Sequence, residues 1–218
     1  MLARMAHIES IQIGKPRRLE PVEGELSKRG WTTAFHKQPV DGPVWASRTG
    51  LEGDEVAERR VHGGPDKAMC VYPADRLPHW RGVLGEADLG PAPFGENLSV
   101  AGMTEEDVCL GDVWRVGDAV LEVSQPRQPC WKLARRWKRK ELSLLVQETG
   151  YTGWYVRVAE EGALAPGDPI ELAQRPHADW TIARANDVMY EREDAVGELI
   201  DVRALAASWK RQLQKRLD

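Results

Sequence analysis

Short apolar segments separated by turn residues fill the chain up to about residue 176, and this punctuation limits what the chain can fold into. Residues 8–14 alternate apolar and polar side chains and then reach Gly-Lys-Pro, which is typical of a strand that ends in a turn. Many short, turn-bounded strands predict a β-barrel or a β-sandwich. The predicted strands are residues 8–14, 31–36, 44–48, 67–72, 113–116, 119–123, 154–158 and 170–172.

The pattern changes after His177, where strand signals give way to helical spacing. The predicted helices are residues 180–190, 195–202 and 203–217. Asp179 or Thr181 is suited to cap the first of them. An apolar stripe runs along the last one: Leu205, Trp209, Leu213 and Leu217. Helices this short are marginal in isolation, so we expect them to pack on one another and on the β-rich part.

The sequence therefore predicts a mainly β fold with added α-helices. It consists of a β-barrel domain over residues 1–176 and a small three-helix C-terminal extension over residues 177–218. Two further helices are expected inside the first domain, at residues 73–84 and 138–149. The second of these ends at Gly150, a residue that suits a helix C-terminus.

Composition excludes several classes of protein. The chain has 218 residues and a formal charge of −4, which argues against a dedicated nucleic-acid binder. No run of about 18 apolar residues exists, and the first residues lack the pattern of a secretory signal. The absence of such an apolar run predicts no membrane partner. Three cysteines are too few for a disulfide framework, so we expect a reducing, cytoplasmic location.

Cys130 lies in the segment most suggestive of chemistry, SQPRQPCWKL. The prolines there restrict the backbone, and Arg127 and Lys132 flank the cysteine and would favour its thiolate, the form that attacks electrophiles and binds soft metals. A buried and inert thiol is the alternative. Cys70 and Cys109, among apolar neighbours, are expected to be structural.

Two other segments have weaker signals. In HGGPDK, the paired glycines allow backbone N–H groups to surround an anion, and Lys67 adds a charge suited to phosphate. An ordinary turn explains the same residues, and His62 alone is also consistent with a structural role. In FGEN, Asn97 offers a donor and an acceptor, although turn chemistry accounts for it equally well.

Taken together and in this order, these segments resemble the MOSC domain, and within that superfamily the YiiM family. The resemblance is carried by HGGPDKAMCVYP, PFGENLSV and GDVWRVGDAVLEVSQPRQPCWKL. Shorter matches, from IGKP to RPHADWT, extend it over nearly the whole chain. It implies a MOSC-type β-barrel with a three-helix C-terminal piece and a molybdenum cofactor (molybdopterin).

The resemblance also implies roles for individual residues. Cys130 would ligate the molybdenum, and either His62 or Lys132 would donate a proton. The residues expected around the pterin and its phosphate are His62, Lys67, Asn97, Arg127 and Gln128, together with Cys130. A planar substrate would give Trp131 or Trp154 a stacking role, although core filling is the simpler explanation for the chain's nine tryptophans.

The activity implied is reduction of N-hydroxylated compounds, such as N-hydroxylated purines or amidoximes. Because the chain has no nicotinamide, flavin or iron–sulfur motif, this hypothesis requires a separate electron donor, a flavoprotein or ferredoxin-like protein. A carrier or sulfur-transfer module using a Cys130 persulfide is the alternative. Pyridoxal phosphate belongs only to the wider superfamily, in a desulfurase domain for which this chain has no room.

A basic run at residues 132–140 gives a third hypothesis, association with nucleic acid. Such a run is more often a solvated helix face or a surface that docks phosphate or a partner. A homodimer is among the assemblies that the sequence allows.

Overall fold

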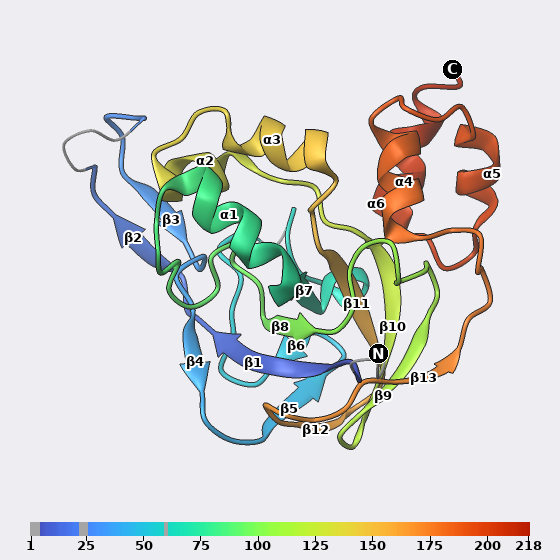
Figure 1. Cartoon of the computed structure of the whole chain (residues 1–218), viewed down its shortest axis with the longest axis horizontal. Helices are drawn as coiled ribbons and strands as arrows, with labels where there is room; N and C mark the ends of the chain where they lie inside the picture. The colour runs from blue at the N-terminus through green and yellow to red at the C-terminus, as the bar shows by residue number, and fades with distance from the viewer. Residues whose placement is uncertain (1–4, 22–25, 59–60) are drawn as a thin grey trace.

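The computed structural model describes residues 5–21, 26–58 and 61–218, and an eight-stranded mixed sheet is its largest feature. The strand order is β13-β9-β10-β11-β7-β8-β1-β4 (Figure 1). Only the β7–β8 pair in this sheet is parallel. The strands are β1 (His7–Ile13), β4 (Gln38–Val40), β7 (Met69–Pro73), β8 (Leu98–Ala101), β9 (Val113–Val116), β10 (Ala119–Pro126), β11 (Trp154–Glu160) and β13 (Glu171–Gln174).

The sheet curls back on itself. The backbone N–H of Ile8 donates to the carbonyl of Asp168 at 3.0 Å, and that of Gly167 donates to the carbonyl of Ile8 at 2.8 Å. These bonds join the start of β1 to the segment that leads into β13, so the two sides of the sheet approach each other as in a barrel. The mainly β fold with added helices, predicted from the turn-bounded strands, is confirmed.

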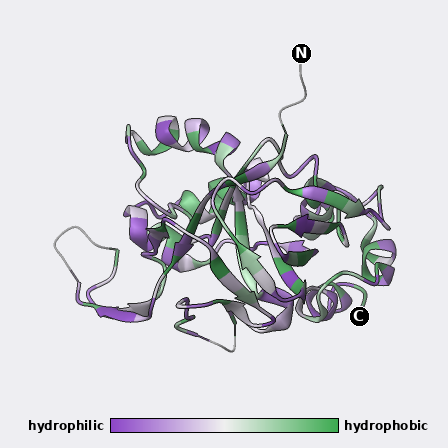
Figure 2. Ribbon diagram, turned by 90° about the horizontal axis from the view of Figure 1, so that it is seen from below, coloured by the Kyte–Doolittle hydropathy of each residue, from purple (hydrophilic) through white to green (hydrophobic). Residues whose placement is uncertain are grey.

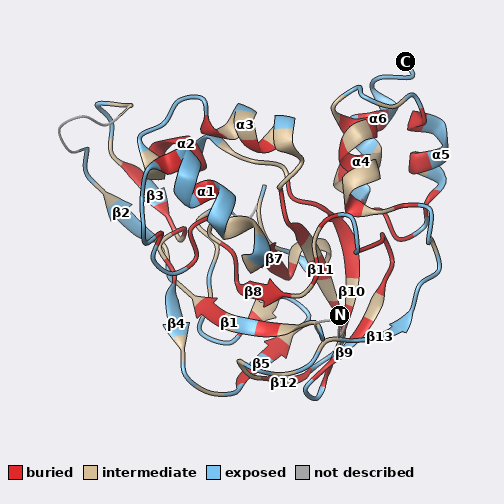
Figure 3. Ribbon diagram, viewed as in Figure 1, coloured by how far each residue is buried: buried red, intermediate tan, exposed pale blue. Residues whose placement is uncertain are grey.

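Two smaller sheets complete the β structure. One consists of β12 (Gly162–Leu164), β5 (Val44–Ser47) and β6 (Gly50–Leu51), and it contacts β10 and β11. The other pairs β2 (Arg17–Leu19) with β3 (Trp31–Thr33). Apolar side chains from the strands form one core with those of the C-terminal helices. Figure 2 colours much of the central strands as hydrophobic, and Figure 3 shows buried residues in red along β8 and β10.

A second apolar core holds the helices that precede β11. These are α1 (Leu77–Leu84), α2 (Trp131–Trp137) and α3 (Leu142–Thr149), with short 3₁₀ turns at Pro65–Lys67 and Ala74–Arg76. Gly150 ends α3 in the left-handed conformation, as expected. The helix α2 was not expected, because the prolines and the cysteine before it favour a loop.

The C-terminal helices share the main core with the sheet. They are α4 (Ile182–Met189), α5 (Val196–Asp201) and α6 (Ala207–Gln214). Thr181 caps α4, because its side-chain oxygen accepts the backbone N–H of Arg184 at 3.0 Å. In the predicted stripe of the last helix, Trp209 and Leu213 are buried, whereas Leu217 is exposed. The boundary at residues 176 and 177 remains a prediction.

Candidate functional site

A pocket of about 410 Å³ lies where the 62–67 loop, the end of β10 and the start of α2 meet. This volume falls in the range of small-molecule and cofactor sites. Most of the residues predicted for the site line it: His62, Lys67, Asn97, Arg127, Cys130 and Lys132. The structure thus brings together predicted residues that are far apart in the chain, from His62 to Lys132.

Gln128 is the predicted site residue that the structure places elsewhere. Its side chain donates to Oε1 of Gln212, on α6, at 3.0 Å, and it does not line the pocket. Prolines on both sides of Gln128 fix an extended backbone, and neighbouring side chains of an extended segment point to opposite sides. Arg127 therefore lines the pocket while Gln128 faces the C-terminal helices.

Cys130 directly precedes α2 and is only partly buried. Its carbonyl accepts hydrogen bonds from the backbone N–H of Leu133 at 3.0 Å and from the hydroxyl of Ser143 at 3.2 Å. Both predicted flanking cations, Arg127 and Lys132, line the same pocket. A thiol is therefore held by a fixed backbone in cationic surroundings, where a soft metal or an electrophile could reach it.

Arg127 has a hydrogen-bonding group that the protein does not satisfy. The residue is 4% exposed, and its Nη2 donates to the carbonyl of Phe94 at 2.9 Å. Its Nη1 is buried and has no hydrogen-bond partner among the described residues. A guanidinium keeps its charge in a protein, and a buried donor without an acceptor costs about 1–3 kcal/mol, more when charged. This arrangement fits a pocket that receives an anionic ligand.

The 62–67 loop contributes a further cation, Lys67, to the pocket that Arg127 and Lys132 line. Gly63 and Gly64 have φ angles of 81° and 84°, a region that glycine enters without steric cost. Lys67 donates from Nζ to the carbonyl of Val61 at 2.9 Å. Desolvation by burial lowers the pKa of Lys67.

Asp66, the acidic residue of this loop, has hydrogen-bond partners that lie outside the pocket. Asp66 accepts the side chain of Arg157 at 2.8 Å through Oδ1 and the backbone N–H of Ala207 at 3.3 Å through Oδ2. It does not line the pocket. Its carboxylate therefore bonds to β11 and α6, and toward the pocket its charge acts on Lys67, where it opposes the larger effect of burial on the lysine pKa.

The surroundings of His62 lower the pKa of its imidazole. Burial, followed by the charges of Arg127, Lys67 and Lys132, lowers its pKa from 6.5 to about 4. Each of these effects disfavours the imidazolium. At neutral pH His62 is therefore an uncharged ring among cations.

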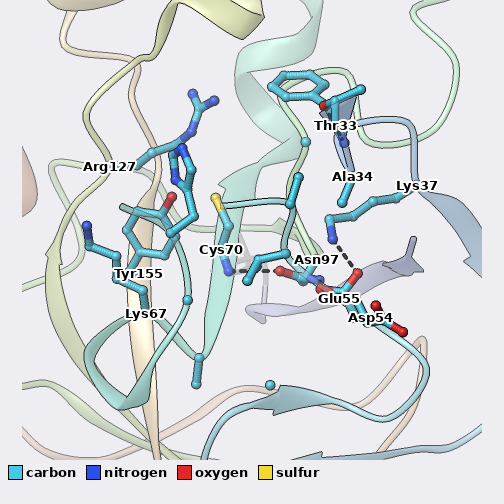
Figure 4. Close-up of a pocket in the computed structure, with 18 of the residues that line it drawn as sticks. Thr33, Ala34, Lys37, Asp54, Glu55, Lys67, Cys70, Asn97, Arg127 and Tyr155 are labelled. Atoms are coloured by element: carbon cyan, nitrogen blue, oxygen red, sulfur yellow. Dashed lines mark hydrogen bonds and ion pairs between the residues drawn. The ribbon is translucent and has the colours of Figure 1, made fainter. Parts of the chain in front are cut away.

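The opposite wall holds charges that pair with each other. Lys37 and Asp54 form an ion pair, and their side chains are 6% and 7% exposed. Asp54 also accepts the backbone N–H of Gly14 at 2.8 Å and the side-chain amide of Asn97 at 2.9 Å. The amide oxygen of Asn97 accepts the backbone N–H of Cys70 at 3.2 Å. Figure 4 shows this network across the pocket from Arg127, Tyr155 and Lys67.

Several lining residues were missed from the sequence, among them Lys37, Asp54 and Tyr155. Cys70, expected to be structural, is buried, and its burial raises the pKa of the thiol to about 12, but it also lines the pocket. Lys37 and Asp54 lie in turns of ordinary composition, so no local pattern marks them. The charges of the run GLEGDE were the one available signal for Asp54.

The predicted stacking role of the tryptophans does not fit the structure. Trp154 is fully buried and packs edge-on against Trp114, whereas Trp131 is exposed and lies against Trp31. Neither tryptophan lines the pocket, whose aromatic rings are those of Phe35, Phe94 and Tyr155.

The basic run at residues 132–140 divides between interior and surface. Lys132 and Arg135 are buried, and Arg136 lies 2.8 Å from Nδ1 of His36. Residues 138–140 are exposed. The run is therefore not one continuous solvated helix face.

No group of three or more His, Cys, Asp or Glu side chains in the described chain could together hold a metal ion. Within the same residues, no helix has the length and apolar character needed to cross a membrane.

Comparisons with known proteins agree with this arrangement. Residues 58–171 match the MOSC domain, and residues 180–218 match the YiiM-like 3-alpha helix domain. The chain is 44% identical over 212 residues to YflK of Bacillus subtilis, covering 96% of this chain and 93% of that protein. It is 41% identical over 192 residues to YiiM of Escherichia coli, covering 86% and 85%.

A more distant relative and a solved structure extend the comparison. A protein of Gibberella moniliformis named Reductase is 36% identical over 210 residues, which cover 90% of this chain and 36% of that longer protein. The crystal structure of YiiM from Geobacillus stearothermophilus superposes with a TM-score of 0.80 at 36% identity, covering 98% of this chain and all of the other. The chain thus belongs to the MOSC domain family, in the YiiM-like group that carries a three-helix C-terminal domain.

Proposed function

We propose that this protein is a molybdenum-cofactor-dependent reductase of N-hydroxylated compounds, such as N-hydroxylated purines or amidoximes. The observation that carries the proposal is the Nη1 of Arg127, which has no partner within the described part of the chain, in a pocket that Cys130 also lines. A ligand that combines a phosphate with a thiophilic metal would satisfy the guanidinium and bind the sulfur. MOSC domains are associated with this cofactor in general, and the donors present here fit it.

The residues of the pocket divide the binding task. Arg127 and Lys67 would hold the phosphate, with the backbone around Gly63 and Gly64 close to it. Cys130 would supply the soft ligand to the metal. When bound, the cofactor supplies the two-electron chemistry of oxygen removal, and the protein supplies position and charge.

The reaction also requires two protons. Overall, R–NHOH takes up two electrons and two protons and gives R–NH₂ and water. Lys132 presents an ammonium at the pocket wall and is our candidate for holding a proton. His62, with a pKa of about 4, is uncharged at neutral pH and is better suited to relay a proton than to store one.

The fungal relative named Reductase supports the same class of chemistry, although it is much longer than this chain. One observation keeps a second function open. Cys130 is only partly buried, and an accessible thiol is also what a cofactor carrier or a persulfide-bearing sulfur-transfer module needs.

The experiment compares the parent with Cys130→Ala and, as a matched control, Cys109→Ala. Cys109 is a buried cysteine away from the pocket, where its thiol lies 3.4 Å from the carbonyl of Ala178. Each protein is purified from a host that makes the cofactor. Molybdenum per chain is measured, as is reduction of 6-N-hydroxylaminopurine by an artificial viologen donor.

We expect metal and turnover in the parent and in the Cys109 variant, and loss of both in the Cys130 variant. Metal without turnover in the parent would favour the carrier. Absence of metal from every protein, even after reconstitution with cofactor, would overturn the proposal.

A further inference from the structure

The C-terminal helical domain bonds a loop of the pocket wall, although it lines no part of the pocket itself. None of residues 180–218 is among the described lining residues. In the 62–67 loop, His62 and Lys67 line the pocket, whereas the side chain of Asp66 bonds to β11 and α6. The loop therefore contacts the pocket on one side and the helical domain on the other.

Asp66 is held through three of its oxygen atoms. Oδ1 accepts Nε of Arg157 at 2.8 Å, and Oδ2 accepts the backbone N–H of Ala207, the first residue of α6, at 3.3 Å. The carbonyl of Asp66 accepts the hydroxyl of Ser124, a fully buried residue of β10, at 2.6 Å. Because Asp66 is the middle residue of the 3₁₀ turn Pro65–Lys67, these bonds fix the position of that turn.

Arg157 joins the loop to two other parts of the molecule. Besides its bond to Asp66, it donates from Nη1 to Oε1 of Glu122 on β10 and to the carbonyl of Ala204, both at 2.8 Å. Its side chain is 22% exposed, so water only partly screens these charge-assisted bonds. The backbone N–H of Ala206 also donates to a carbonyl of β10 at 3.0 Å. The guanidinium therefore fixes the loop relative to both β10 and the segment that leads into α6.

We propose that Asp66 and Arg157 are positioning residues of the pocket, which hold the 62–67 loop in the conformation that receives the phosphate of the ligand. The helical domain takes part in binding through these contacts, without touching the ligand. This inference rests on the proposed function, in which Lys67 and the backbone of the loop bind the phosphate. A loop that is already fixed loses less conformational entropy on binding, so it binds the same anion more tightly.

The charge of Asp66 must be separated from its contacts, because the carboxylate also acts on the neighbouring lysine. Burial lowers the pKa of Lys67, and the negative charge of Asp66 opposes that effect. The substitutions Asp66→Asn and Asp66→Ala remove the same charge. Asparagine retains an oxygen that can accept Nε of Arg157, whereas alanine retains no side-chain acceptor. A difference between these two variants therefore measures the contact and not the charge.

The test measures affinity for inorganic pyrophosphate by calorimetry, at a temperature at which circular dichroism shows every protein to be folded. The variants are Asp66→Asn, Asp66→Ala, Arg157→Met and the double variant Asp66→Ala with Arg157→Met. The matched control is Glu122→Gln, which neutralises the other carboxylate bonded to the same guanidinium and leaves the loop contact in place. In the ligand-free proteins, ¹⁵N relaxation of the Gly63 and Gly64 amides gives the mobility of the loop on the picosecond to nanosecond timescale.

We expect Asp66→Ala to bind pyrophosphate about tenfold more weakly than Asp66→Asn, since only the asparagine keeps a bond to the guanidinium. The order parameters of the two glycine amides should fall in the same variant, from about 0.85 toward about 0.6. The double variant should bind no more weakly than Arg157→Met, because both substitutions remove one shared contact. Glu122→Gln should match the parent in both measurements.

Equal pyrophosphate affinities in Asp66→Asn and Asp66→Ala would overturn the proposal, even if the loop became more mobile. A loss in Glu122→Gln as large as that in Asp66→Ala would also overturn it, because the effect would then not depend on the loop contact. A parent that binds no pyrophosphate would count against the anion site of the proposed function. In that case the order parameters would still decide whether Asp66 and Arg157 position the loop.

Discussion

Charge is arranged differently on the two walls of the pocket. On the wall of Lys37, Asp54 and Asn97, the cation, the carboxylate and the amide bond one another and the backbone. On the opposite wall, Arg127 has a buried donor without a partner among the described residues, and His62 is kept neutral by burial and by the cations around it. The acid nearest in sequence to the second group, Asp66, is turned toward α6.

This difference distinguishes a structural use of charge from a binding use. A buried ion pair that is complete within the chain fixes the positions of the turns that carry it. Buried positive charge without a partner lowers stability until a ligand supplies the negative charge. The comparison predicts that substitutions on the first wall change folding and substitutions on the second change binding.

The largest effect is expected for Lys37→Met, which leaves the Asp54 carboxylate buried without its cation. Loss of one partner of a buried pair typically costs about 3–5 kcal/mol, and the bonds from Gly14 and Asn97 place this case near the lower value. Urea denaturation measures the free energy of unfolding. The double variant Lys37→Met with Asp54→Asn should recover much of the loss, and a double variant as unstable as the single one would contradict the pairing.

Arg127→Met should have the opposite pattern. Removing a buried charge with an unsatisfied donor should leave the unfolding free energy of the ligand-free protein nearly unchanged or raise it. The affinity for inorganic pyrophosphate, measured by calorimetry, should fall by about 10- to 100-fold, the value of one or two charge-assisted hydrogen bonds. Unchanged pyrophosphate affinity would remove Arg127 from the anion site.

The titration of His62 should make the unfolding free energy depend on pH. Its pKa of about 4 in the folded protein lies below the value of 6.5 expected when unfolded. Above pH 6.5 neither state is protonated, and between pH 6.5 and 4 the unfolded state binds more protons, so the unfolding free energy falls as the pH falls. Because His62 is partly exposed, we expect the unfolding free energy to fall by only about 1–2 kcal/mol over this pH interval.

Unfolding free energies at pH 7 and pH 4.5 check this expectation. His62→Gln should lose less stability than the parent over that interval. His36 needs its own control, His36→Gln, because burial and Arg136 lower its pKa to about 4 as well. If His62→Gln loses as much stability as the parent, the cationic wall does not act on this ring.

The smallest effect is expected for Gln128→Ala. This side chain bonds Gln212 at the surface and lies outside the pocket. We expect a change of about 0.5 kcal/mol or less in unfolding free energy and no change in pyrophosphate affinity. A tenfold loss of affinity would place Gln128 in the anion site after all.

Sequence periodicity predicted the strands that have one buried and one exposed face, such as β9 and β11. It missed β8, whose four residues are all buried and leave no alternation to detect, whereas the equally buried β7 was predicted from a longer apolar run. It also missed α2, whose first turn follows two prolines and Cys130. Local signals were absent in both places, and tertiary packing decided the structure.

The residues of the candidate site also fall into two groups, those that a local sequence motif identifies and those that no local pattern marks. Residues in short distinctive motifs, such as His62 and Cys130, could be identified one segment at a time and were brought into one pocket. Lys37 and Asp54 could not, because a pair separated by 17 positions across two turns leaves no local pattern. Gln128 was misplaced because a motif does not state which side of the backbone each side chain occupies.

The carboxylate of Asp66 couples the pocket loop to the C-terminal helical domain. It joins the loop that carries His62 and Lys67 to the first backbone N–H of α6. A ligand that immobilises this loop also holds Asp66 in place, and part of its binding free energy then opposes the local opening of α6. Amide hydrogen exchange at the start of this C-terminal helix should therefore slow when a ligand fills the pocket. The exchange rate in the helical domain would then show whether the distant pocket is occupied.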